Sequence, residues 1–245
     1  MLEIETKRFI FKKKNIWFSD SPFDVKGCSL VVFYVCKNKI DFPGAIPEES
    51  PTIIIDLTQN LDTIWKNIEQ RTRRYIKRAE KEGIEIRLNE NFKEFNELYY
   101  RFVSQKGFES FGEDLNIMRR YGTILNAYKD NELIAGLLTI EDHIHIRILV
   151  GASKRFEGDK KMSNLVSWAN RALIWEAMRL GKEKGCKVFD LGGYYTGGDK
   201  NDPRYNINLF KLKFGGNIVT YYKYIKYYSM LYKFIKTLLK KEKAL

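Results

Sequence analysis

The sequence of 245 residues has little cysteine and histidine, and it contains no long apolar run. Its three cysteines form no Cys-x-x-Cys pair, so we expect reduced thiols in a cytoplasmic protein. The longest clean apolar run, Leu30–Cys36, has seven residues, whereas a membrane-spanning helix needs about 20. We therefore predict no transmembrane helix. Glu and Lys interrupt the stretch Met1 to Asn15, so we also expect no secretory signal.

Several common catalytic signatures are absent as well. There is no Gly-x-Ser-x-Gly elbow, no phosphate-binding P-loop and no Gly-x-Gly-x-x-Gly fingerprint. The two histidines, His143 and His145, would share one face of a strand, but no third ligand with suitable spacing lies nearby. We therefore predict no metal site and no tightly bound cofactor. A nucleophilic role for Cys28 or Cys186 has no support beyond residue type.

The net charge of +12 is concentrated in two short segments. Six basic residues and one acid lie between Arg71 and Lys81, and seven lysines and one acid lie between Tyr221 and Leu245. Clustered charge raises the local potential, which favours an anionic partner. The alternative for either segment alone is a solvated helix face that only aids solubility.

Hydrophobic periodicity predicts an α+β fold with helices packed on a mixed sheet. Residues 61–82 carry one apolar stripe at helical spacing, with Asn60 as the N-cap and Gly83 just past the end. Residues 123–150 alternate like an antiparallel meander, with one turn at Asp130-Asn131. We predict further helices at 91–106 and 163–184, strands at 30–35, 53–57, 84–88 and 187–191, and a proline-rich loop at 41–51.

Residues 221–245 are predicted to form a basic amphipathic helix. Aromatic and aliphatic residues from Tyr224 to Leu239 would occupy one arc, and lysines the other side. Such a helix suits an anionic surface, so peripheral contact with the inner membrane face is one hypothesis. The alternative is that the apolar arc packs on the protein core and completes the domain.

The most distinctive local sequence lies between residues 189 and 216. A predicted strand ends there at the pair Gly192-Gly193, and Lys211 precedes a second pair, Gly215-Gly216. Glycines at a strand end let backbone N–H groups approach a ligand closely. Taken singly, each of these glycines more commonly serves only a turn, and Asp190 would cap a backbone group.

Together these segments resemble the C-terminal signature of the FemAB-like acyltransferases, a branch of the GNAT superfold. An earlier series, an Asp-Leu strand end followed by a helix, a basic stretch and a new strand, resembles the same family. The likeness covers about residues 52–220. The matching segments are Phe189–Gly193, Asp202-Pro203, Phe210-Lys211, Phe214–Gly216, Asp56-Leu57, Arg73–Gly83 and Ile84.

The resemblance implies a GNAT-like mixed sheet in an abbreviated N-terminal region at 1–90 and a complete acyltransferase domain at 91–220, followed by the helix at 221–245. It also implies transfer of an acyl or aminoacyl group to a primary amine of a cell-envelope or polysaccharide precursor, such as a peptidoglycan stem peptide. The donor would be aminoacyl-tRNA, as in the peptidoglycan-bridge members, or an acyl thioester such as acyl-CoA.

The resemblance also assigns roles to residues. The family's Phe-Lys pair matches Phe210 and Lys211, and that lysine would neutralise phosphate or developing negative charge. Backbone N–H groups at either glycine pair are further candidates for stabilising the oxyanion. The proton acceptor would be Asp190 or the substrate itself. The expected substrate-binding residues are Phe210, Gly192, Gly193, Tyr194, Arg73, Arg74, Lys77, Gly215 and Gly216.

The chain departs from the family at the loop that binds pyrophosphate in GNAT proteins. The pattern Arg/Gln-x-x-Gly-x-Gly/Ala is matched only in part, because Lys160 stands at its final small position. The residues at the key positions of this partial match, Arg155, Gly158 and Lys160, are the expected contacts with donor phosphate. The coiled-coil arm of some members is absent.

Two other functions fit the same residues. One is a plain acyl-CoA-dependent N-acetyltransferase, which would bind acetyl-CoA. The other is a non-catalytic RNA-binding module that uses the basic 71–81 face and the interleaved tyrosines. That module would bind generic RNA tightly and with strong salt dependence, and it would have no transfer activity.

Overall fold

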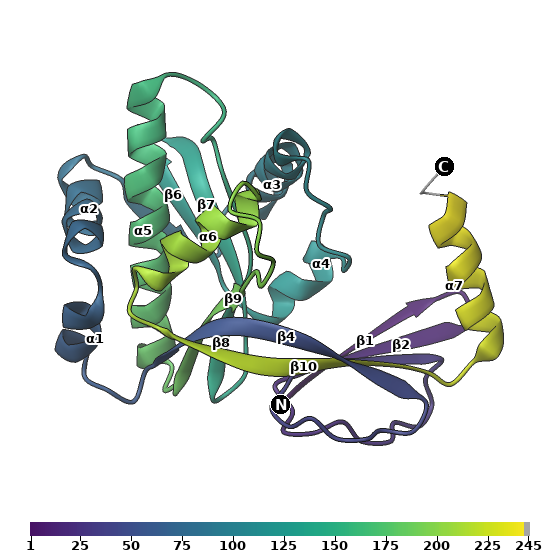
Figure 1. The fold of residues 1–245 in the computed structure, drawn as a ribbon. Helices are drawn as coiled ribbons and strands as arrows, with labels where there is room; N and C mark the ends of the chain where they lie inside the picture. Colours follow the sequence, from purple (N-terminus) through teal and green to yellow (C-terminus); the bar gives the residue numbers. More distant parts are fainter. Residues whose placement is uncertain (243–245) are drawn as a thin grey trace. The chain divides into compact units, whose positions relative to one another are not determined.

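The structure, a computed structural model, describes residues 1–242, and side chains through Thr237. The chain forms two compact units, which Figure 1 shows as ribbons. Unit 1 contains Met1–Thr52 and the residues from Ile218 onward, and unit 2 contains Ile53–Asn217. These limits differ from the expected division after residues 90 and 220, because the last strand returns to pair with an N-terminal strand.

Unit 2 is built on a mixed sheet. Its strands are neighbours in the order β4-β9-β8-β7-β6-β5, with β8 and β9 parallel and β5 to β8 antiparallel. Its elements are β4 (Ala45–Asp56, shared with unit 1), α1 (Leu61–Asn67), α2 (Gln70–Lys81), β5 (Glu85–Leu88), α3 (Phe92–Lys106), α4 (Leu115–Met118), a 3-10 turn (Arg119–Tyr121), β6 (Ile124–Lys129), β7 (Glu132–Glu141), β8 (His145–Ser153), α5 (Lys160–Glu183), β9 (Val188–Gly193) and α6 (Pro203–Leu212).

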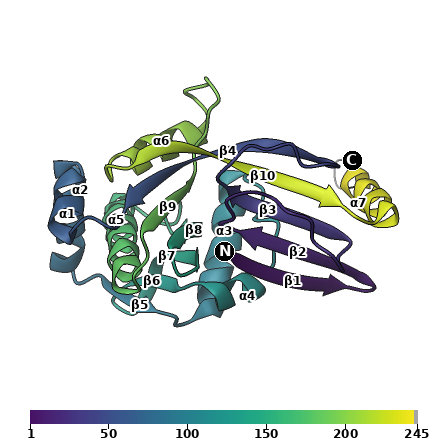
Figure 2. The same cartoon turned by 90° about the horizontal axis from the view of Figure 1, so that it is seen from below.

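Alternation along β7 places helices on opposite faces of this sheet. Ala135 and Leu137 belong to the buried core that includes Ala169 of α5. A Cβ added to Gly136, between them, would lie 2.6 Å from the ring of Phe95 in α3. Because successive strand residues point to opposite faces, α5 and α3 cover different faces, as Figure 2 shows from below. The predicted α+β fold of a mixed sheet with packed helices is therefore confirmed.

Local signals placed most elements of unit 2 correctly. The meander is confirmed as β6, β7 and β8. Asp130 and Asn131 have φ of 50° and 63°, which is the left-handed pair that a two-residue type I′ hairpin requires. Asn60 caps α1 by accepting a hydrogen bond from the Thr63 N–H at 2.8 Å, as predicted. Gly83 follows α2 with φ of 67°.

The single helix predicted over residues 61–82 is wrong. The chain leaves the helical conformation at Ile68 and Glu69, whose ψ angles are 134° and 137°, so α1 and α2 are separate helices. The Glu69 N–H donates instead to the carbonyl of Lys213 at 2.9 Å. A partner more than a hundred residues away therefore interrupts a stripe that looks continuous in sequence.

The proline-rich loop predicted over residues 41–51 is also wrong in part. β4 begins at Ala45 and includes Pro47 and Pro51. Proline restricts φ to a value compatible with a strand, but it lacks a backbone N–H. A strand can therefore contain proline at positions where no N–H has to donate to a neighbouring strand.

Unit 1 contains the strand that replaces the first part of the predicted C-terminal helix. β1 (Leu2–Arg8), β2 (Phe11–Trp17), β3 (Leu30–Cys36) and β10 (Asn217–Tyr227) lie side by side in that order. β10 pairs antiparallel with β3, and Tyr224 is completely buried. The Tyr224 hydroxyl accepts a hydrogen bond from the Ile40 N–H at 2.8 Å. The helix predicted for residues 221–227 is therefore wrong, because these residues form a strand that pairs with β3.

The C-terminal helix, α7, begins at Met230 and extends to Glu242. Residues 243–245 lie outside the described part of the chain, as do the side chains of Leu238 and Leu239 in the expected apolar arc and of Lys240 on the expected basic side. Among the described residues, no helix is both long enough and apolar enough to span a membrane.

Gly215 offers a direct test of the packing in unit 2. Its φ is 78°, and a Cβ there would lie 2.5 Å from the carbonyl oxygen of Asn67. We expect Gly215→Ala to lower the free energy of unfolding by about 2 kcal/mol or more, because backbone must move. Gly198→Ala is the matched control, since its Cβ meets nothing within 4 Å. Equal melting temperatures for the two variants would contradict this account of the packing.

Candidate active site

The candidate site lies where the parallel pairing between β8 and β9 of unit 2 ends. The pairing of β8 with β9 runs from His145↔Val188 to Arg147↔Asp190, and both strands continue beyond it. Ligands of sheets with parallel strands commonly bind at the carboxyl ends of those strands. The predicted motif residues Asp190, Gly192 and Gly193 occupy this end of β9.

Hydrogen bonds to Arg147 and Gly192 help to hold Asp190 at the last paired position of β8 and β9. Its Oδ2 accepts a hydrogen bond from Nη1 of Arg147 in an ion pair, and the two side chains are only 3% and 12% exposed. Its Oδ1 accepts a hydrogen bond from the Gly192 N–H at 2.7 Å. Gly192 has φ of 84°, a conformation that favours glycine. The carboxylate therefore fixes the turn of the glycine pair.

Lys211 reaches this turn from α6. The helix begins with Asp202 as N-cap and Pro203 in its first turn, and Lys211 lies in its last turn. The Lys211 ammonium donates a hydrogen bond to the Gly193 carbonyl at 2.7 Å. Burial and the nearby Arg147 charge lower the pKa of Lys211 to about 8, although Asp190 acts in the opposite direction. The structure thus brings Lys211, Asp190 and the first glycine pair together.

Asn208, which sequence reasoning missed, joins α6 to the segment after β9. This buried side chain accepts a hydrogen bond from the Tyr195 N–H at 3.0 Å and donates one to the Tyr195 carbonyl at 2.7 Å. The two bonds hold the chain that follows Gly193 against the helix that carries Lys211. No spacing rule connects Asn208 with Tyr195, so only their contact identifies this role.

Phe210 and Tyr194 pack against the core of unit 2. The Phe210 ring also stacks under the Arg171 guanidinium, 4.9 Å from its centroid. Arg171 lies 5.0 Å from the Tyr75 ring as well, and burial lowers the pKa of its guanidinium. Arg71 donates from Nε to the Tyr75 hydroxyl at 3.0 Å. Alternating cations and rings thus connect the basic helix α2 with α6.

The second glycine pair serves a different purpose from the first. Gly215 packs against the backbone at Asn67, and a Cβ on Gly216 would lie 2.8 Å from the Ile54 carbonyl. Gly215 also lines a cavity of about 310 Å³, together with Asp56 and Asn67, but Lys211 is not among the residues around it. The structure therefore does not bring Gly215 and Gly216 into the cluster around Lys211, and their role in binding stays a prediction.

The three expected basic contacts on α2 face outward to different extents. Arg74 and Lys77 are exposed, whereas Arg73 is half-buried, and Thr72, Ile76 and Ala79 fill the inner face. Lys77 lies 5.9 Å from the ring of Trp65. The helix thus keeps a basic outer face, as the charge pattern predicts.

The β8–α5 loop contains the residues expected to contact donor phosphate. Gly158 has φ of 110°, and Lys160 is the first residue of α5. Asp159 caps this helix by accepting a hydrogen bond from the Met162 N–H at 2.9 Å. A carboxylate therefore already occupies the helix N-terminus, where backbone N–H groups and the helix dipole would otherwise stabilise a bound pyrophosphate. Arg155 lies close enough to Arg171 that its charge lowers the pKa of that guanidinium further.

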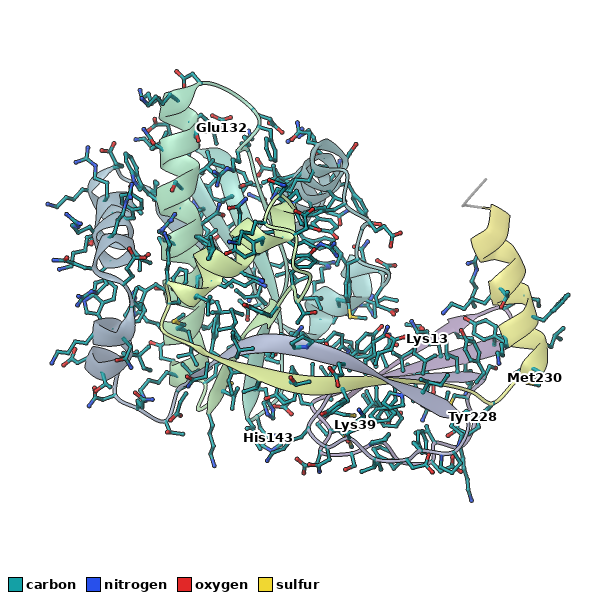
Figure 3. All side chains as sticks on the ribbon, in the orientation of Figure 1. Lys13, Lys39, Glu132, His143, Tyr228 and Met230 are labelled. Atoms are coloured by element: carbon teal, nitrogen blue, oxygen red, sulfur yellow. The ribbon has the colours of Figure 1, made fainter. Side chains whose placement is uncertain are left out.

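The histidines do not share a strand face. His143, labelled in Figure 3, lies in the turn before β8, and only His145 belongs to the strand. His145 Nδ1 lies 3.1 Å from Asp142 Oδ1. The expectation that both occupy one strand is wrong, because Asp142 and His143 form the turn between β7 and β8. Within residues 1–242, no group of three or more potential metal ligands is gathered.

The buried ion pair gives a second prediction. We expect Arg147→Met to lower the free energy of unfolding by about 3–5 kcal/mol, because it leaves the Asp190 carboxylate without its charged partner. The double variant Arg147→Met/Asp190→Asn should recover part of the loss. Arg179→Met is the control, since its ion pair with Glu176 is exposed and contributes less than about 1 kcal/mol. Equal denaturant midpoints for Arg147→Met and Arg179→Met would refute a structural role for the pair.

Comparison with known proteins identifies the fold. No family model and no curated protein matches the chain. FemX superposes with a TM-score of 0.66 at 14% identity, over 95% of this chain and 85% of that one. The C-terminal domain of a protein described as a lysylphosphatidylglycerol synthetase, from Agrobacterium fabrum, gives a TM-score of 0.57 at 12% identity, over 91% and 80% of the chains. L-PGS from Bacillus licheniformis superposes with a TM-score of 0.51 at 16% identity, over 84% of this chain and 71% of that one. The chain has the FemX-like fold that its motifs predict.

Proposed function

We propose that this protein transfers an acyl or aminoacyl group from a phosphate-rich donor to a primary amine of an anionic cell-envelope precursor. The observation that carries the proposal is the Lys211 ammonium, which lies at the Gly193 carbonyl at the end of β9 on a FemX-like fold. In support, the structural neighbours include FemX and the domain of a protein described as a lysylphosphatidylglycerol synthetase, a name that denotes an enzyme making lysylphosphatidylglycerol.

The reaction forms a C–N bond and breaks the C–O or C–S bond of the donor. Attack by the amine places negative charge on the former carbonyl oxygen, and this oxyanion needs a cation or a hydrogen-bond donor. Lys211 can supply both, because an ammonium has three N–H donors and Gly193 occupies one of them. A pKa of about 8 leaves most of the ammonium protonated at neutral pH.

The amine must also lose a proton, and the predicted acceptor is Asp190 or the substrate itself. The Asp190 oxygens accept hydrogen bonds from Arg147 and Gly192, which favours a positioning role over proton transfer. A proton-acceptor role for Asp190 stays a prediction. The alternative is that the proton leaves with the donor's alkoxide or thiolate, which becomes basic as its bond to carbon breaks.

The arrangement of cations favours aminoacyl-tRNA over acyl-CoA as the donor. The exposed cations Arg71, Arg74 and Lys77 give α2 an extended basic face that suits a phosphate backbone. Contacts from Arg71 to Tyr75 and from Tyr75 to Arg171 tie this face to the rest of unit 2. The N-terminus of α5, in contrast, carries the Asp159 carboxylate at the position that a compact pyrophosphate would use.

Removal of the ammonium tests the proposal. We expect Lys211→Ala to lower turnover by about 100-fold while leaving the fold intact, because one oxyanion donor is typically worth about 3 kcal/mol. The assay follows labelled aminoacyl-tRNA, and separately labelled acyl-CoA, onto amine-bearing envelope precursors. Asp199→Ala, on the exposed loop before α6, is the control for nonspecific loss. A rate within about twofold of wild type would refute the assignment, and salt-dependent binding of generic RNA without transfer would indicate a binding module.

The pH dependence tests the charge on Lys211. Lys211 carries its charge below a pKa of about 8 and loses it as the pH rises through that value. Arginine stays charged throughout, so we expect the ratio of wild-type to Lys211→Arg kcat/KM to fall as the pH rises from 7 to 9. Taking the ratio cancels the titration of the substrate amine. A ratio that rises over this interval would show that Lys211 acts as a base.

A further inference from the structure

The turn between β1 and β2 in unit 1 presents two large apolar side chains to solvent. Arg8 and Phe11 form the last pair of the hairpin, which leaves Phe9 and Ile10 as the two turn residues. Phe9 is 83% exposed and Ile10 is 78% exposed. Single exposed apolar residues are common on protein surfaces. Two adjacent ones at the tip of a tight turn are less usual, because neither side chain buries its apolar surface against the protein.

The backbone at this turn makes phenylalanine a costly choice for folding. Phe9 has φ of 54°, a conformation in which a bulky residue is strained and glycine is at ease. Two-residue hairpins with a positive φ at their first position strongly favour glycine there. Phe9 also buries little of its apolar surface within the chain, so contact with an external apolar environment would account for it.

The first turns of α7 lie at the same end of the unit 1 sheet. Strand register places Tyr227, the last residue of β10, opposite Leu30, and Leu30 opposite Lys13 near the start of β2. The rings of Phe11 and Tyr232 are in contact, with centroids 4.8 Å apart. Figure 3 labels Lys13 and Met230 at this end of the unit.

The start of α7 is apolar and exposed as well. Met230, Leu231 and Phe234 are 73%, 59% and 63% exposed. Tyr232, on the same helix, uses its ring to contact the hairpin. We call this end of unit 1 the apolar tip; its apolar residues are Phe9, Ile10, Met230, Leu231 and Phe234.

Basic residues surround the apolar tip. The segment Lys7 to Lys14 contains five basic residues and no acid, and α7 adds Lys233 and Lys236. Glu3 and Glu5, on the opposing strand, pair with Lys14 and Lys12. Positive charge still exceeds negative charge around the tip. Apolar and aromatic side chains with a rim of lysine and arginine match the interface of an anionic bilayer, which offers hydrocarbon beneath negative headgroups.

We propose that the apolar tip inserts into the surface of an anionic lipid bilayer. The hairpin and α7 form two points of attachment, with the basic rim at the level of the headgroups. The excess of basic residues favours a lipid surface over a second copy of this chain, because two such tips would repel each other. The proposal concerns unit 1 alone and does not depend on the transfer reaction.

Vesicle flotation with the full chain tests the proposal. We expect binding to vesicles of phosphatidylcholine with about 30% phosphatidylglycerol, little binding to pure phosphatidylcholine, and weaker binding as salt rises. The variants Phe9→Gly/Ile10→Ser and Leu231→Ser/Phe234→Ser should each lower the partition coefficient at least about tenfold. Ile218→Ser is the matched control, because this exposed residue lies at the opposite end of β10.

Thermal melting separates binding from folding in the same variants. Glycine suits the positive φ at position 9, so Phe9→Gly should keep the melting temperature or raise it while it weakens vesicle binding. Unchanged vesicle binding in both double variants would overturn the proposal. So would equal binding to neutral and anionic vesicles, or a dimer in solution that the same substitutions dissociate.

Discussion

The buried ion pair between Arg147 and Asp190 organises the candidate site. The two side chains lie at the last paired position of β8 and β9, where removing either charge from water is costly unless the other is present. The same carboxylate accepts the Gly192 N–H and so shapes the turn that presents the Gly193 carbonyl to Lys211. The Arg147 charge also contributes to the lowered pKa of that lysine. The ion pair thus shapes the turn beside the candidate catalytic group, whereas burial is the main cause of the lowered pKa of Lys211.

The paired glycines show that one sequence pattern can meet two physical needs. Gly192 adopts a left-handed conformation beside Lys211, whereas Gly215 and Gly216 let the chain pass close to the backbone of Asn67 and Ile54. The first pair lies beside Lys211, and the second is packed against neighbouring backbone. The cationic side chains divide in a similar way, because Arg171 is stacked between Tyr75 and Phe210, while Arg74 is exposed on the outer face of α2. Charge in this unit is therefore partly packed within the fold and partly exposed on its surface.

Unit 1 combines a well-packed interior with an apolar tip that its own fold does not require. Tyr224 and Phe33 are completely buried, and the ring of each packs edge to face against the ring of Phe42. At the end of the same sheet, Phe9 remains exposed in a conformation that phenylalanine does not favour. The exposed Phe9 contrasts with these buried rings, and the proposed contact with a lipid surface would account for it.

The sequence by itself determined the elements that depend on neighbouring residues only. The Asn60 cap, the Asp130-Asn131 hairpin and the long helix α5 follow from turn chemistry and helical periodicity, and the motif already placed Lys211 near Asp190. Only the tertiary structure decided the rest. Arg147 meets Asp190 from 43 residues away, and the Lys213 carbonyl stops the helix at Glu69. Pairing with β3 makes residues 221–227 a strand, because such long-range pairing outweighs helical periodicity and leaves no local mark in the sequence.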